Sequence, residues 1–109
     1  MHEEIYEKLK HVARRRTVVH YSEIAPLAGL DMQLPYDRKQ LGDLLGDIST
    51  YEHRHGRPML SAVVVHAEDG RPGKGFFQLA RLLGLLHKSG DDEVFFAGEL
   101  QRVHDHWGR

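Results

Sequence analysis

The sequence contains no cysteine and no long apolar run. The missing cysteines exclude disulfides, thiolate nucleophiles and zinc sites built on cysteine ligands. No stretch approaches the roughly 18 apolar residues of a membrane-spanning helix. The first residues, Met1-His2-Glu3-Glu4, are acidic and polar, unlike the basic start and apolar stretch of a signal peptide. We therefore expect a cytoplasmic protein with no membrane partner.

An excess of charge of either sign is also missing, because the net charge is −1 with neutral histidines. Dedicated nucleic-acid-binding proteins are often strongly basic, and this chain is not. The hydrophobic and charged fractions, 40% and 28%, are typical of a globular protein. A chain of 109 residues fits one domain over residues 1–109, since two separate cores would each be very small.

Two helices are predicted near the start of the chain. Residues 3–15 have apolar side chains at helical spacing, with glutamates at the beginning and arginines at the end, an order that complements the helix dipole. Residues 17–20 form a short strand or an extended link. A second, short helix follows, with Ser22 as a plausible N-cap and Gly29 as its end.

A third helix is predicted from a cap at Asp37 to about His53. Gly42 and Gly46 lie four residues apart beside its apolar stripe, and each weakens a helix by about 1 kcal/mol relative to alanine. Close approach of another backbone would compensate, so we expect tight packing at these glycines. The apolar stripe consists of Leu41, Leu44, Leu45, Ile48 and Tyr51.

The second half begins with the clearest strand, residues 59–66. Asp69-Gly70 is a hairpin signal, and residues 74–77 could return as a second strand. A buried helix to Gly84 and a final helix from Asp91 or Asp92 follow; the final helix has an apolar face of Phe96, Leu100, Val103 and Trp107. Three helices, a hairpin and added C-terminal helices predict an α+β winged helix-turn-helix.

Three segments resemble the DNA-binding domain of DNA alkyltransferases and alkyltransferase-like proteins. Residues 18–29, Val-Val-His-Tyr-Ser-Glu-Ile-Ala-Pro-Leu-Ala-Gly, are similar to the family's V-x-Y-G-E-I-A-x-x-A-G opening. Residues 41–45 are similar to its recognition helix, and residues 58–70 loosely resemble its I-P-x-H-R-V-V-x-x-D-G segment. The resemblance implies a winged helix. The family's acceptor cysteine is absent, so alkyl transfer to the protein is excluded.

The predicted fold suggests a nucleic-acid interface, with double-stranded DNA as the partner. In helix-turn-helix proteins the first turn of the recognition helix approaches base edges, and a basic turn can contact phosphates. The third helix would supply the base contacts and the hairpin turn the phosphate contacts. The residues concerned are Arg38, Lys39 and Gln40 on the helix, Arg71 and Lys74 at the turn, and Arg15 and Arg16 as helpers.

Other interpretations remain open for the same residues. Each basic cluster could equally be an ordinary solvated surface. Asp43, Asp47 and Glu52 on the third helix would repel phosphates if they faced DNA, which favours a protein-interaction or homodimerisation module. The histidines have no metal-binding spacing such as His-Glu-x-x-His, and no serine lies in a hydrolase motif. We therefore expect no enzyme activity, no cofactor and no metal.

Overall fold

The computed structural model describes residues 1–109 and begins with helix α1 (Glu3–Arg14). Ile5 and Leu9 on its apolar face are completely buried. His2 caps the start of the helix, because its ring nitrogen Nδ1 accepts the N–H of Ile5 at 3.2 Å. The chain leaves the helix at Arg16, which has the left-handed φ of 55°. The predicted first helix is therefore confirmed.

Helix α2 (Tyr21–Ile24) is a single turn that continues into a 3-10 turn, η1 (Ala25–Ala28). Its N-cap is His20, not Ser22, and the Glu23 carboxylate accepts the His20 backbone N–H at 2.9 Å. The segment ends at Gly29 as predicted, because φ is 68° there and glycine adopts this conformation without steric cost.

Helix α3 (Pro35–Arg54) is longer than the sequence predicted and starts two residues before Asp37. Leu34 occupies the N-cap, and Pro35 fills the first position, where its missing N–H costs nothing. The Asp37 carboxylate accepts the N–H of Asp31 in the preceding loop at 2.9 Å. Asp37 therefore fixes the approach to the helix instead of capping it.

The sheet consists of two short parallel strands, β1 (Val19–His20) and β2 (Val64–Val65), paired as Val19 with Val64 and His20 with Val65. The predicted hairpin is wrong. Half of the predicted strand at residues 59–66 is the 3-10 turn η2 (Leu60–Val63), and the expected return strand at residues 74–77 belongs to a helix.

That helix, α4 (Lys74–Leu82), has Gly73 as its N-cap. Phe76, Phe77 and Ala80 are all buried. A strand would point Phe76 and Phe77 to opposite faces, whereas one helical face buries both together with Ala80. Burial of this apolar face is the physical reason for a helix where the sequence suggested a strand.

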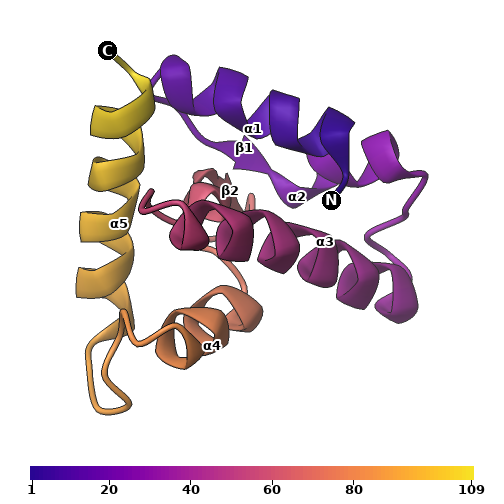
Figure 1. Cartoon of the computed structure of the whole chain (residues 1–109). Helices are drawn as coiled ribbons and strands as arrows, with labels where there is room; N and C mark the ends of the chain where they lie inside the picture. Colours follow the sequence, from indigo (N-terminus) through magenta and orange to yellow (C-terminus); the bar gives the residue numbers. More distant parts are fainter.

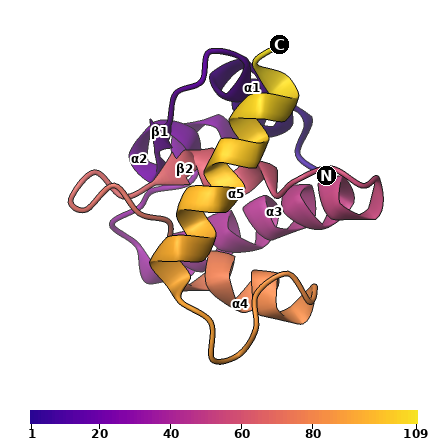
Figure 2. The ribbon, with the colours of Figure 1, turned by 90° about the vertical axis from the view of Figure 1, so that its left-hand side faces the viewer.

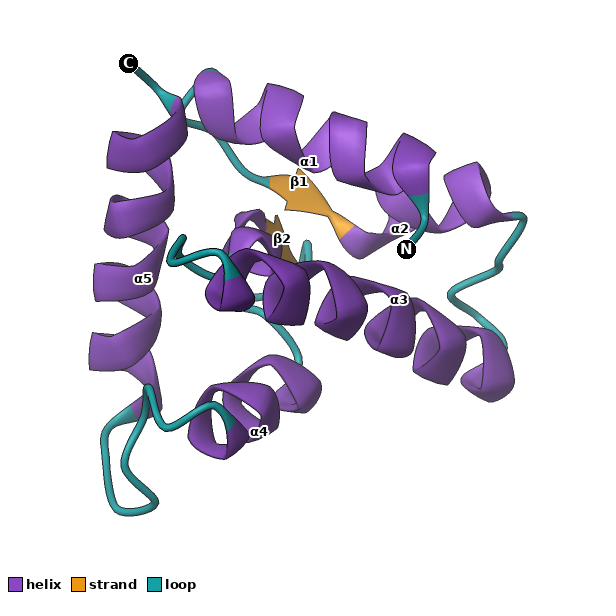
Figure 3. Cartoon of the chain, viewed as in Figure 1, coloured by secondary structure: helices purple, strands orange, loops and turns teal.

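Helix α5 (Asp92–Trp107) is capped by Asp91, whose carboxylate accepts the Val94 N–H at 3.0 Å. It lies across one end of α1 and α3 (Figures 1 and 2). Its predicted apolar face packs on the core, with Val103 completely buried and its other members partly buried. The fold is thus α+β, with five helices around two short parallel strands (Figure 3).

Candidate functional site

A pocket with a volume of about 170 Å³ opens between α3, α4 and the loop that follows β2. Met32, Leu45, Phe76 and Leu79 supply its apolar lining. Its polar lining residues come from four separate parts of the chain. These are Tyr21, Arg38, Ser61 and His66.

Four glycines make room for this pocket. Gly42 and Gly46 lie one turn apart on α3, and Gly73 and Gly75 flank the start of α4. A Cβ atom at Gly42 would meet nothing within 4 Å, and one at Gly46 would only touch Leu79 at 3.8 Å. The expected close backbone packing at Gly42 and Gly46 is therefore wrong: the missing side chains leave open space.

The parallel register of the strands brings Tyr21 and His66 together. Each residue directly follows a strand, and the strands end side by side. The two rings have centroids 4.5 Å apart and an interplanar angle of 32°. His66 also lines two neighbouring hollows, so it lies at the centre of this surface.

Tyr21 has a fixed acceptor role and a free proton. Its hydroxyl oxygen accepts the backbone N–H of Gly73 at 2.8 Å. Burial raises the pKa of the Tyr21 phenol. The hydrogen bond from the Gly73 N–H lowers this pKa, and the negative charge of Asp69 raises it. The phenol therefore stays protonated at neutral pH, and its O–H can donate to a molecule in the pocket.

Ser61 is positioned by Ser49, which is completely buried. The Ser49 hydroxyl accepts the backbone N–H of Ser61 at 3.0 Å, and the two hydroxyl oxygens lie 2.6 Å apart. Ser49 has no other side-chain partner, so it avoids an unpaired buried proton only by donating to Ser61. The Ser61 proton is then left free at the pocket wall.

Arg38 completes the rim without a carboxylate partner. Its Nη1 donates to the backbone carbonyl of Met32 at 2.9 Å, which holds the guanidinium beside the pocket and leaves its other N–H groups free. The twelve lining residues include no aspartate and no glutamate. The pocket therefore presents several hydrogen-bond donors and no fixed negative charge.

The structure brings three of the predicted interface residues to this surface. Arg38 lines the pocket, and Arg71 and Lys74 line an adjoining hollow of about 580 Å³, with His66 between the two. Arg71 pairs with Glu93 at 3.1 Å, whereas Lys74 is exposed and forms no ion pair. Arg38 and Lys74 are thus the cations here that form no ion pair, although Glu68 lines a hollow with Arg38, and Asp69 and Asp92 line the hollow with Lys74.

Lys39 and Gln40 do not join Arg38. Lys39 pairs with Asp43 at 3.2 Å, and Gln40 shares a different hollow with Asp43 and Leu44. Successive residues of a helix point about 100° apart, so residues 38 and 40 face nearly opposite directions. Arg38, Lys39 and Gln40 therefore do not share one face of the helix.

Arg15 and Arg16 lie apart from the pocket, where the end of α1 meets the end of α5. Arg16 pairs with Asp105 of α5 at 2.9 Å, and Arg15 is exposed. The Arg16–Asp105 pair links the two helices. The structure therefore does not place these two arginines beside Arg38 and Lys74.

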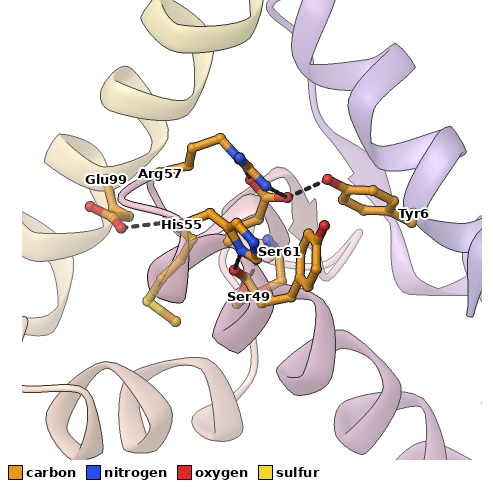
Figure 4. A network of polar contacts seen from close by, with 9 residues as sticks. Tyr6, Ser49, His55, Arg57, Ser61 and Glu99 are labelled. Carbon is orange, nitrogen blue, oxygen red and sulfur yellow. Dashed lines mark hydrogen bonds and ion pairs between the residues drawn. The ribbon is translucent and has the colours of Figure 1, made fainter. Parts of the chain in front are cut away.

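A second polar network occupies the opposite end of α3 (Figure 4). The Glu52 carboxylate is completely buried, accepts the Tyr6 hydroxyl proton at 2.5 Å and pairs with Arg57. Glu99 of α5 accepts the Met59 N–H at 2.9 Å. These carboxylates have protein partners for their charge, so the network connects α1, α3, α5 and the intervening loop.

Comparisons with known protein families, with curated proteins and with solved structures found no match. No group of three or more histidine, aspartate or glutamate side chains converges as a metal site would. None of the helices combines the length and apolar character needed to cross a membrane. The pocket and its rim therefore stand as the candidate site on geometry alone.

Proposed function

We propose that the protein binds double-stranded DNA through the surface around His66. The first turn of α3 would lie against the duplex, with Arg38 and Lys74 contacting phosphates on either side of the pocket. The observation that carries this proposal is the position of these two cations, neither of which forms an ion pair, in adjoining hollows that His66 joins. Phosphate contacts of this kind supply most of the non-specific affinity of DNA-binding proteins.

The start of α3 is well suited to approach a groove. Leu34 and Tyr36 there are 51% and 72% exposed, so the first turn projects beyond the core. Helix-turn-helix proteins contact base edges with this part of their recognition helix. We propose the same arrangement here, with the loop between β2 and α4 in the place of the winged-helix hairpin.

The acidic residues of α3 oppose DNA binding less than the sequence suggested. Glu52 is buried and paired. Asp43 pairs with Lys39 and lines the hollow that contains Gln40. Asp47 is nine residues after Arg38 and therefore points about 180° away from it on the helix. The helix face that carries Arg38 is free of carboxylates over these turns.

A salt titration of duplex binding tests the proposal. Replacing Arg38 and Lys74 together by glutamine should weaken binding and reduce the salt slope by about two charges' worth. The matched control replaces Lys39 and Lys88, which lie outside the proposed contact, and should change the slope much less. Absence of duplex binding even at about 50 mM salt would exclude this function.

A protein-interaction module is the second candidate function. Leu82 at the end of α4 and Val94 in the first turn of α5 are 84% and 72% exposed, so a partner that covered them would remove apolar surface from water. A homodimer that covers them is the simplest form of this alternative. Analytical ultracentrifugation of the native chain and of a Leu82→Ser/Val94→Ser variant tests it, because only the native chain should dimerise.

A further inference from the structure

The pocket has the dimensions of a single aromatic ring. Its volume of about 170 Å³ slightly exceeds that of an engineered apolar cavity of about 150 Å³ that admits benzene. Leu45, Phe76 and Leu79 provide apolar surface, and Gly46 leaves space on the α3 side. A ring placed here would gain contact with apolar side chains on more than one helix.

The polar rim specifies the chemical character of the rest of the ligand. Arg38 provides a planar guanidinium, and Tyr21 and Ser61 each retain a hydroxyl proton that no protein group accepts. A ligand must therefore offer hydrogen-bond acceptors. Because no carboxylate lines the pocket, an anionic acceptor meets no fixed negative charge. A guanidinium binds planar carboxylates with paired hydrogen bonds.

We propose that this pocket binds a small one-ring aromatic carboxylate, with the ring on the apolar lining and the carboxylate at Arg38. Tyr21 and Ser61 would donate to the carboxylate or to a further acceptor on the ring. This site does not depend on DNA binding, although Arg38 takes part in both. A ligand carboxylate at Arg38 would compete with a DNA phosphate for the same guanidinium.

Titration of the full chain with benzoate, followed by the amide NMR signals of Gly42, Gly46 and Gly73, tests the proposal. Benzoate should shift these signals saturably and bind about tenfold more tightly than benzamide, its neutral planar counterpart. Acetate, which has the charge and no ring, should not saturate them. Equal binding of benzoate and benzamide, or no binding of benzoate, would overturn the proposal.

Two variants separate the contributions of charge and space. Arg38→Gln should reduce benzoate affinity about tenfold, to the level of benzamide, and leave benzamide affinity unchanged; Lys39→Gln is the matched control and should change neither. Gly46→Leu should abolish binding of both ligands, because a Cβ atom at Gly46 lies 3.8 Å from Leu79 of the pocket lining and a longer side chain there would occupy the pocket. Unchanged benzoate binding by Gly46→Leu would contradict the assigned site. Benzoate binding in a chain that fails to bind DNA would support this site and exclude only the proposed function.

Discussion

Tyr21 and His66 meet because they directly follow β1 and β2 in register. Val19 pairs with Val64 and His20 with Val65 in parallel. Tyr21 and His66 are the next residue after each strand, so the same register places them side by side. Their rings then lie 4.5 Å apart between centroids. An antiparallel hairpin after β2 would not have produced this contact. The center of the candidate site is therefore a consequence of sheet topology.

Tyr21→Phe should loosen the loop between β2 and α4. The substitution removes the oxygen that accepts the Gly73 N–H at 2.8 Å and keeps the ring beside His66. We expect a loss of about 1 kcal/mol in the free energy of unfolding and faster amide exchange at Gly73. Tyr36→Phe, at a position 72% exposed, is the control. Unchanged exchange at Gly73 would show that the tyrosine does not hold the loop.

Gly42→Ala should stabilise the protein by about 1 kcal/mol, because alanine favours a helix interior and the added methyl group meets nothing within 4 Å. Thermal unfolding of the variant provides the measurement. Gly29→Ala should instead destabilise the chain by about 1 kcal/mol, because φ is 68° at Gly29. A destabilising Gly42→Ala would mean that another group packs against this glycine after all.

Glu52→Gln should lower the free energy of unfolding by about 2 kcal/mol, because the hydrogen bonds to a charged carboxylate become hydrogen bonds to a neutral amide. Glu52 is completely buried, and the change leaves Arg57, whose side chain is 24% exposed, without its charged partner. Urea unfolding measures the loss. Glu7→Gln removes an exposed partner of Lys10 and should change stability by no more than about 0.5 kcal/mol. Similar effects of the two substitutions would rule out a special contribution from the buried pair.

Tyr6 should make the protein less stable at alkaline pH. Burial, and then the hydrogen bond to Glu52, raise its pKa from 10.0 to about 12. Between these two values the unfolded chain loses the phenol proton while the folded chain keeps it, so unfolding becomes easier as the pH rises. Urea unfolding at several alkaline pH values should show a smaller decline for Tyr6→Phe than for the native chain. Equal declines would place the effect elsewhere.

The sequence predicted part of the site. Arg38, Arg71 and Lys74 were identified as basic residues at a helix start and a turn, and they lie around His66. The sequence places Lys39 and Gln40 next to Arg38, but the side chains of successive helical residues point about 100° apart around the helix axis. Tyr21, Ser61 and His66 were missed as site residues, because no local pattern shows that three distant segments line one pocket.

Helical periodicity and end signals in the sequence determined α1 and α5 and the apolar face of α3, because the residues that form these elements are close together along the chain. The lack of cysteine likewise excluded thiolate chemistry. Only the tertiary structure decided that β1 and β2 are parallel, that residues 74–77 begin a helix, and that Gly42 and Gly46 border a pocket. Each of these depends on what packs against a segment from elsewhere in the chain, and burial of Phe76 and Phe77 on one face outweighed the local strand signal.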